Sequence, residues 1–273
     1  MLELLCLAIA LAGSAFGGWK DFRTTDVPDR LVFGMIGAGL LLNSVEWVAF
    51  GNWAAFQVSV LATACFGAFG VVMYKAGAWG GADGAMLTAV GSLLPIWPIS
   101  IVPSPLTMLP FPFVYFFSVF MVGLVWSVGY VVNRVIRSPV LIRKFISGVR
   151  RQKAAAAVSV VASAMALVFG PPPFSFILSL LLLVMSPMQV LVKVSEPAFR
   201  RKVSTRLLRV GDMLGEDLPG LRLRKRELRG LTEVEVRRIR KAQRTVMIHE
   251  GVPYVPAFFF TLLVLIALEL VLA

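Results

Sequence analysis

Long apolar runs, separated by short polar or proline-rich connections, are the main pattern of this chain. Most runs hold about 20 residues, the length that carries an α-helix across a bilayer, where each backbone polar group must find its partner within the segment. We therefore expect an all-α polytopic membrane protein with six to eight transmembrane helices. The eight candidate spans are Leu2 to Gly17, Leu31 to Phe50, Trp53 to Met73, Ala85 to Val102, Phe111 to Val132, Ala154 to Phe169, Phe174 to Val192 and Val255 to Leu272.

The polar stretches between these runs indicate five parts. Residues 1–133 have short connections and are expected to form the membrane core with both candidate acids described below. Residues 134–153 form a basic cytoplasmic loop with interleaved apolar residues, a composition that fits the membrane surface. Residues 154–192 predict an additional transmembrane hairpin that turns at three consecutive prolines. Residues 193–253 are long enough for a small cytoplasmic module, and residues 254–273 hold the final span.

The small module is predicted to be basic and of the α+β type. Apolar residues alternate between Val203 and Leu221, and Gly211 and Pro219 interrupt them, which is typical of short strands and turns. Further on, Thr232-Glu233-Val234-Glu235 has the form of a capping box and predicts the start of a helix. We expect this helix to pack against the membrane core and to lead into the final span.

The net charge of +12 is distributed unevenly along the chain. Lys and Arg gather after the first, fifth and seventh candidate spans, whereas the connections around 51–52, 103–110 and 171–173 contain neither. By the positive-inside tendency, the basic connections face the cytoplasm and both termini face outside. The charge therefore predicts an orientation in the cell membrane and contact with membrane lipids, and it is not explained by nucleic-acid binding.

Two cysteines and one histidine restrict the chemistry that the chain can support. Cys6 and Cys65 both fall within candidate spans, where a free thiol acts as a small apolar residue, so we expect no disulfide. His249 stands close to the last span, where an interfacial role is favoured over catalysis. This composition disfavours a zinc-dependent or Ser-His protease, and we expect neither a metal nor a cofactor.

Two aspartates stand where an apolar run stops on the same side of the membrane: Asp21 after the first span and Asp83 before the fourth. Ionisable residues at membrane depth are candidates for function, because an unpaired carboxylate there costs free energy. Two nearby carboxylates cannot both ionise cheaply, so such a pair holds one base and one acid for peptide hydrolysis. Each residue also has a simpler interpretation: Asp83 as a helix cap and Asp21 as a solvated residue beside Lys20 and Arg23.

The sequences around the two aspartates form recognisable motifs. The first is Asp21-Phe22-Arg23-Thr24-Thr25-Asp26-Val27-Pro28, and the second is Gly80-Gly81-Ala82-Asp83. Together they resemble the paired motifs of the type IV prepilin peptidase family, in particular its archaeal preflagellin peptidase branch. The second motif of that family is Gly-x-Gly-Asp, so Ala82 is a departure that leaves the aspartate in place. Similarity extends to 230–235, 250–258 and 109–112, whereas the hairpin of 154–192 looks like an addition to the usual six-helix plan.

This resemblance implies a GxGD-type aspartic endopeptidase of the membrane, with Asp21 and Asp83 as its catalytic residues. Such an enzyme removes class III signal peptides from preflagellin (archaellin) and prepilin-like precursors at the cytoplasmic face. Two cysteines cannot build the tetracysteine zinc module of bacterial relatives, and no methyl-donor loop is evident, so we expect no N-methyltransferase activity. The residues expected to bind substrate or to shape the site are Gly80, Gly81, Ala82, Gly84, Arg23 and Pro28.

Two alternative functions remain open at this point. A presenilin or signal-peptide-peptidase type protease shares the Gly-x-Gly-Asp motif, although the motif that runs from Asp21 to Pro28 argues against it. A transporter or membrane scaffold would use the two aspartates as ion ligands or topology devices, although the polar residues of the spans form no continuous series. An ordinary solvated role is favoured for the acidic residues that are candidates to attract a basic signal peptide: Asp26, Asp29, Glu216, Asp217 and Glu250.

Overall fold

The computed structural model describes residues 2–98, 109–169, 179, 183, 190–191, 193–221, 223 and 230–272. The chain forms two compact units. Unit 1 consists of Met1–Ser127 and Gly251–Ala273, and unit 2 consists of Val128–Glu250. The last apolar helix therefore belongs to the same unit as the first helices, although a separate unit lies between them in the sequence.

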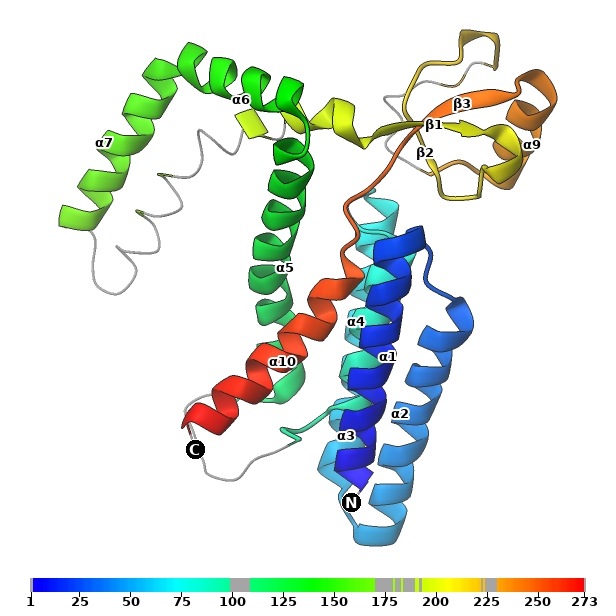
Figure 1. Ribbon diagram of the computed structural model, residues 1–273. Helices are drawn as coiled ribbons and strands as arrows, with labels where there is room; N and C mark the ends of the chain where they lie inside the picture. The colour runs from blue at the N-terminus through cyan, green and yellow to red at the C-terminus, as the bar shows by residue number, and fades with distance from the viewer. Residues whose placement is uncertain are drawn as a thin grey trace. The chain divides into compact units, whose positions relative to one another are not determined.

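Unit 1 is a bundle of apolar helices around a short central helix (Figure 1). The central helix, α4, contacts α1, α2, α3 and α10, and every residue from Met86 to Leu94 is buried. A helix that is apolar on all sides is typical of such a position. The helices of this unit are α1 (Leu2–Thr24), α2 (Asp29–Phe50), α3 (Trp53–Lys75), α4 (Gly81–Leu93), α5 (Phe111–Ile136, whose last residues belong to unit 2) and α10 (Val255–Leu272).

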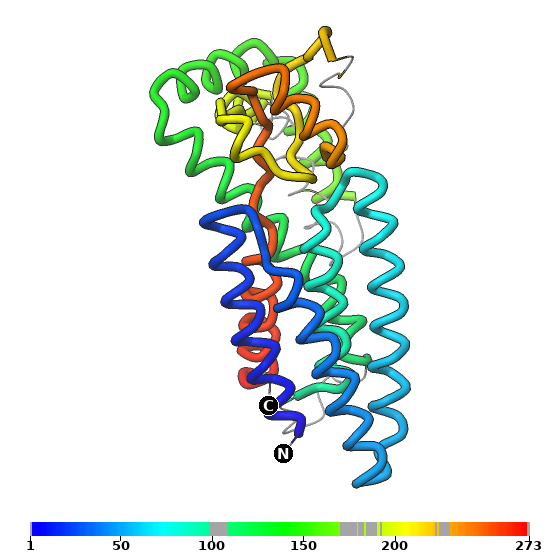
Figure 2. Tube along the Cα trace, turned by 90° about the vertical axis from the view of Figure 1, so that its right-hand side faces the viewer, coloured from blue at the N-terminus to red at the C-terminus, as the bar shows by residue number. Residues whose placement is uncertain are grey.

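Small residues allow α4 to approach its neighbours closely. A Cβ atom on Gly70 of α3 would lie 2.7 Å from the Cα atom of Gly84, and one on Gly39 of α2 would lie 2.6 Å from Oγ of Ser92. Helices in membranes associate through such small residues because their backbones can then pack in van der Waals contact. Figure 2 shows α2 and α3 side by side as a hairpin that packs against α4.

The described residues include four helices long and apolar enough to cross a membrane: α1, α2, α3 and α5. A fifth is added if α6 and α7, which are bent by 71°, form one broken span, and Val255–Val271 is a shorter apolar helix. The chain is therefore a mostly helical, multi-pass membrane protein. The count of six to eight spans is not confirmed, and much of the second half of the predicted hairpin at 154–192 lies outside the described residues.

The fourth predicted span, Ala85 to Val102, is wrong in its extent. Helix α4 has only 13 residues and ends at Leu93. The next residue, Leu94, has φ −120° and ψ 72°, outside the helical region, and Pro95 follows it. A proline disfavours helical geometry in the residue before it, so the apolar run continues in the sequence while the helix stops.

Unit 2 begins with helices where the sequence predicted a basic loop. Helix α5 continues to Ile136, α6 covers Pro139–Arg151, and α7 covers Lys153–Phe169. The loop at 134–153 is thus largely helical, because its apolar residues recur with helical spacing and a proline begins α6 at a permitted position.

The rest of unit 2 contains a small sheet, in agreement with the predicted strands and turns. Three antiparallel strands have the order β1-β3-β2, and in β3 His249 pairs with Arg200 on one side and Met213 on the other. Short 3-10 turns connect them. The elements are η1 (Glu196–Phe199), β1 (Arg200–Ser204), η2 (Thr205–Leu207), β2 (Met213–Leu214), η3 (Pro219–Leu221), α9 (Glu233–Ala242) and β3 (Thr245–His249).

Helix α9 starts at the predicted capping box, but the final span does not follow it directly as predicted. The backbone N–H of Thr232 donates to Glu235 Oε2 at 2.8 Å, and the N–H of Glu235 donates back to Thr232 Oγ1 at 3.4 Å. Val236 and Ile239 pack with apolar residues of the small sheet. The helix does not lead directly into the final span, because strand β3 follows it and pairs with β1 and β2.

Candidate active site

Asp21 lies in the last turn of α1, four residues beyond the end of the predicted span at Gly17. Helix α1 continues to Thr24, and the N–H of Thr25 closes its last turn on the Asp21 carbonyl at 2.8 Å. The Asp21 side chain is buried, with 8% of its residue surface exposed. Its Oδ2 accepts a hydrogen bond of 3.0 Å from the N–H of Val255, the first residue of α10. A helix N-terminus favours negative charge, so this contact stabilises the ionised carboxylate.

Asp83 is the third residue of α4 and lies outside the four candidate spans. Its Oδ2 accepts a 2.8 Å hydrogen bond from the N–H of Gly80, the N-cap residue, so the side chain caps its own helix from inside the first turn. Burial and, to a smaller extent, the negative charge of Asp21 raise the pKa of Asp83 to about 7. A carboxyl group with this pKa is partly protonated near neutral pH.

The structure brings Asp21 and Asp83 to the same end of unit 1. A Cβ atom on Gly17 of α1 would lie 2.6 Å from Cε of Met86 in α4. This contact is about one helical turn from each aspartate, because Gly17 precedes Asp21 by four residues and Met86 follows Asp83 by three. The end of α1 and the beginnings of α4 and α10 therefore meet around the two carboxyl groups.

Two aromatic residues, Trp79 and Tyr254, pack together beside the segments that hold Asp83 and the Asp21 hydrogen-bond donor, and neither was predicted as a site residue. The Tyr254 ring, just before α10, lies 5.7 Å from the Trp79 ring, just before α4. The Tyr254 hydroxyl donates to the carbonyl of Val119 at 3.1 Å. Burial and then the negative charge of Asp83 raise the pKa of this hydroxyl to about 12, so Tyr254 stays protonated. The order of aromatic residues in the sequence does not reveal such a contact between distant segments.

The other residues of the first motif differ in burial and in position. Arg23 is exposed, and its guanidinium lies 5.0 Å from the Trp19 ring. Val27 is buried in the apolar core of unit 1, and Pro28 is the exposed N-cap residue of α2. In the described contacts this motif anchors the connection from α1 to α2.

The residues of the second motif differ in how closely they are packed. A Cβ atom on Gly84 would lie 2.5 Å from the Cα atom of Gly70, so this glycine permits the crossing of α3 and α4. Ala82 packs against the core of unit 1. The same added atom on Gly81 would come no closer than 3.9 Å, to the ring of Tyr74, which is an ordinary contact.

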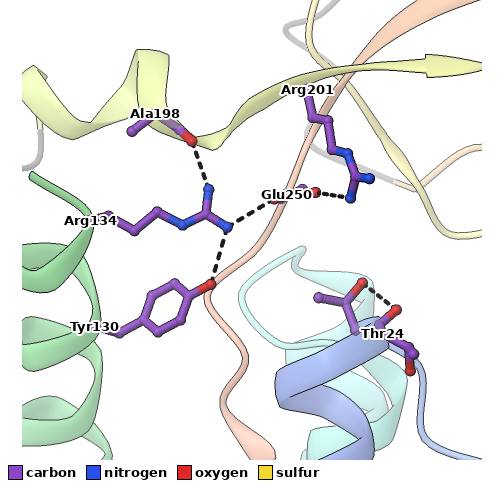
Figure 3. Close-up of polar contacts among 7 residues, drawn as sticks. Thr24, Tyr130, Arg134, Ala198, Arg201 and Glu250 are labelled. Atoms are coloured by element: carbon purple, nitrogen blue, oxygen red, sulfur yellow. Dashed lines mark hydrogen bonds and ion pairs between the residues drawn. The ribbon is translucent and has the colours of Figure 1, made fainter. Parts of the chain in front are cut away.

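Glu250 in unit 2 is held by two arginines (Figure 3). Its carboxylate accepts hydrogen bonds from Arg134 at 3.0 Å and from Arg201 at 3.1 Å. Arg134 also donates to the carbonyl of Ala198 at 2.8 Å and to the Tyr130 hydroxyl at 3.2 Å. The charge of Glu250 is therefore compensated within the chain, which leaves it poorly suited to attract a basic signal peptide.

Taken together, the apolar helices and the two carboxyl groups define a multi-pass membrane protein with an acid pair at one end of its helix bundle. His249, expected at the membrane interface, ends strand β3 and is half-buried, with its ring 6.2 Å from that of Phe199. Among the described residues, no group of three or more His, Cys, Asp or Glu side chains lies together as a metal site would require.

Part of the chain is similar to known leader peptidases. Residues 6–128 match the type IV leader peptidase family. A prepilin peptidase, EppA from Methanothermobacter thermautotrophicus, is 36% identical over 98 residues, which are 36% of this chain and 26% of the relative. The match thus spans about a quarter of the length of that relative. The resemblance to the type IV prepilin peptidase family is confirmed, and residues 6–128 are the part of the chain that carries it.

Proposed function

We propose that this chain is a membrane aspartic endopeptidase that removes class III signal peptides from prepilin-like and preflagellin precursors. The observation that carries the proposal is the juxtaposition of Asp21 and Asp83 where α1, α4 and α10 meet. The match to a family of leader peptidases and the similarity to a prepilin peptidase support the same reaction. The proposed enzyme has no N-methyltransferase activity.

The two aspartates have different surroundings, which support different roles. Asp21 receives the N–H of Val255 at a helix N-terminus and is proposed to be the ionised base. The raised pKa of Asp83 supports its role as the protonated acid. Because the two groups interact, the pair titrates as one unit and the proton that it holds is shared between them.

In the proposed reaction, Asp21 accepts a proton from a water molecule while the water oxygen attacks the carbonyl carbon of the scissile peptide. Asp83 donates its proton to the carbonyl oxygen, which gives a neutral tetrahedral intermediate. When the C–N bond breaks, the leaving nitrogen takes the proton from Asp21, and the hydroxyl proton returns to Asp83. The pair is then restored without a cofactor.

The position of the pair also fits the proposed substrate. A prepilin-like precursor carries a short basic segment before an apolar helix, so its cleavage site lies at the membrane boundary. Asp21 and Asp83 lie at the end of one candidate span and before the apolar part of α4, so a substrate helix can stay in the bilayer while its boundary reaches them. We place this boundary at the cytoplasmic face, on the basis of the positive-inside distribution of charge.

The test is cleavage of a preflagellin-like substrate by the reconstituted chain and by its Asp21→Asn and Asp83→Asn variants. Asn keeps an oxygen that accepts the N–H of Val255 or Gly80 but cannot ionise, so we expect each variant to lose at least about a thousandfold in kcat. Resistance of the spans to added protease checks folding. Full activity in a folded variant would refute the two-aspartate mechanism, and an inactive wild type would favour a transporter or scaffold.

A further inference from the structure

Helix α6 has one apolar edge that its own unit does not cover. Leu141 is buried against Val135 and Leu191 in a small apolar cluster, so that side of the helix is packed. Ile146 on the other edge is 47% exposed. Ile142, Ile146 and Val149 follow the i, i+4, i+7 spacing of one helix stripe, which is therefore only partly covered.

Basic residues flank this stripe without acidic partners. Arg143 directly follows Ile142, and Arg150 directly follows Val149, so both arginines lie along the same side of the stripe. Both arginines are exposed. The sequence contains no Asp or Glu between residues 134 and 195, and the ion pairs of the described residues include none with α6. The surface thus combines an apolar edge with uncompensated positive charge.

The neighbours of α6 in the chain indicate where this surface lies. Helix α5, a candidate membrane span, ends two residues before the N-cap of α6, and the apolar helix α7 begins two residues after α6 ends. The axes of α6 and α7 differ by 71°. If α6 instead continued through the hydrocarbon, its four basic residues would lose their hydration without partners. A short amphipathic helix between two apolar helices is suited to the bilayer surface.

We propose that α6 lies in the membrane interface and binds anionic lipid. The stripe of Ile142, Ile146 and Val149 enters the boundary between headgroups and acyl chains, while Arg143 and Arg150 bind lipid phosphates. Phosphate is the partner that matches guanidinium groups beside an apolar edge, because these groups can bond it in bidentate geometry. The inference rests on α6 alone and does not depend on the proposed peptidase activity.

The first test uses a fluorescent NBD probe on the full-length chain in nanodiscs that hold one copy. The probe is attached at Ile146→Cys or, as a matched control one residue further along the helix, at Ser147→Cys. Both variants carry Cys65→Ala, and the remaining Cys6 is buried. In discs with phosphatidylglycerol, we expect the probe at 146 to be blue-shifted and quenched at least threefold more by interfacial spin-labelled lipid than the probe at 147. Equal quenching at both positions would overturn the proposal.

The second test removes charge from either side of the helix. Arg143→Gln with Arg150→Gln is compared with Lys144→Gln and Arg151→Gln, which remove the same charge on the side away from the exposed stripe. Native mass spectrometry measures the ratio of bound phosphatidylglycerol to phosphatidylcholine. We expect the first pair to lower this ratio severalfold and the second pair to change it less than half as much. Equal effects of the two pairs would overturn lipid binding by this edge. The probe test, repeated in discs with two copies, would overturn it as well if the probe at 146 were shielded there but not in discs with one copy.

Discussion

At the scale of single residues, the Asp21 carboxylate depends on a backbone group that no side-chain motif can specify. Its hydrogen bond comes from the N–H of Val255, 234 residues further along the chain. Sequence motifs report side chains, and every residue except proline carries an N–H, so the sequence could not single out this donor. The sequence alone proposed the two acids as a pair, whereas the backbone N–H that contacts Asp21 is evident only in the fold.

Removing this N–H gives a direct test of the role assigned to Asp21. Proline is tolerated in the first turn of a helix and lacks an N–H, so Val255→Pro deletes the donor at a compatible position. A hydrogen bond to a charged group is worth roughly 1.5–3 kcal/mol, so we expect kcat to fall about 10-fold to 100-fold with KM changed less than about twofold. The acidic limb of the pH–rate profile should move to higher pH, because the ionised base is less stabilised.

The control for this experiment is Val255→Ala, which shortens the buried side chain beside Gly17 but keeps the N–H. It separates loss of packing from loss of the hydrogen bond. If the alanine variant shifts the profile as much as the proline variant does, the N–H does not position Asp21 as proposed.

At the scale of elements, the short helix α4 holds Asp83 and packs at the centre of unit 1. The apolar run predicted a full span, but Pro95 ends the helix early, and its buried residues contact four other helices. Gly84 follows Asp83 directly and meets Gly70 of α3. The glycines of the second motif were predicted to shape the site, but the sequence could not show which of them is required by a helix crossing.

We therefore expect Gly84→Ala and Gly81→Ala to have very different effects. The added methyl group at 84 would lie 2.5 Å from the Gly70 Cα atom, and since backbone cannot move aside as a side chain does, the helices must separate. Overpacking of this kind costs about 1–3 kcal/mol of stability. At 81 the nearest atom is 3.9 Å away, so little change is expected. Thermal unfolding in detergent measures both variants, and equal stabilities would contradict the described crossing.

At the scale of the whole molecule, the raised pKa of Asp83 should make the free energy of unfolding depend on pH. The pKa of Asp83 is raised from 3.8 to about 7 in the folded chain. Between these values the folded chain holds a proton that the unfolded chain has released, so the free energy of unfolding falls as the pH rises from about 4 to about 7.

Asp83→Asn removes this dependence and should therefore stabilise the chain at higher pH while it abolishes activity. We expect the melting temperature of the variant to exceed that of the wild type by a margin that grows from pH 4 to pH 7 and then stays constant. The corresponding gain is on the order of 4 kcal/mol at pH 8, because the pKa of Asp83 rises by about three units on folding and one unit corresponds to about 1.4 kcal/mol. A margin that is constant or that shrinks with rising pH would show that Asp83 is not held in an unfavourable charged state.

The sequence by itself determined the properties that depend on local composition: a multi-pass helical chain, the start of α9 at its capping box, and the two acids beside apolar runs. Spacing and propensity act within about one helical turn or one membrane span, so these features can be derived without a fold. The tertiary structure alone decided the properties that depend on distant segments: the N–H of Val255 at Asp21, Trp79 beside Tyr254, and the pairing of Glu250 with two arginines. These contacts join residues far apart in the sequence, and they form because the packing of apolar helices and the pairing of strands bring those residues together.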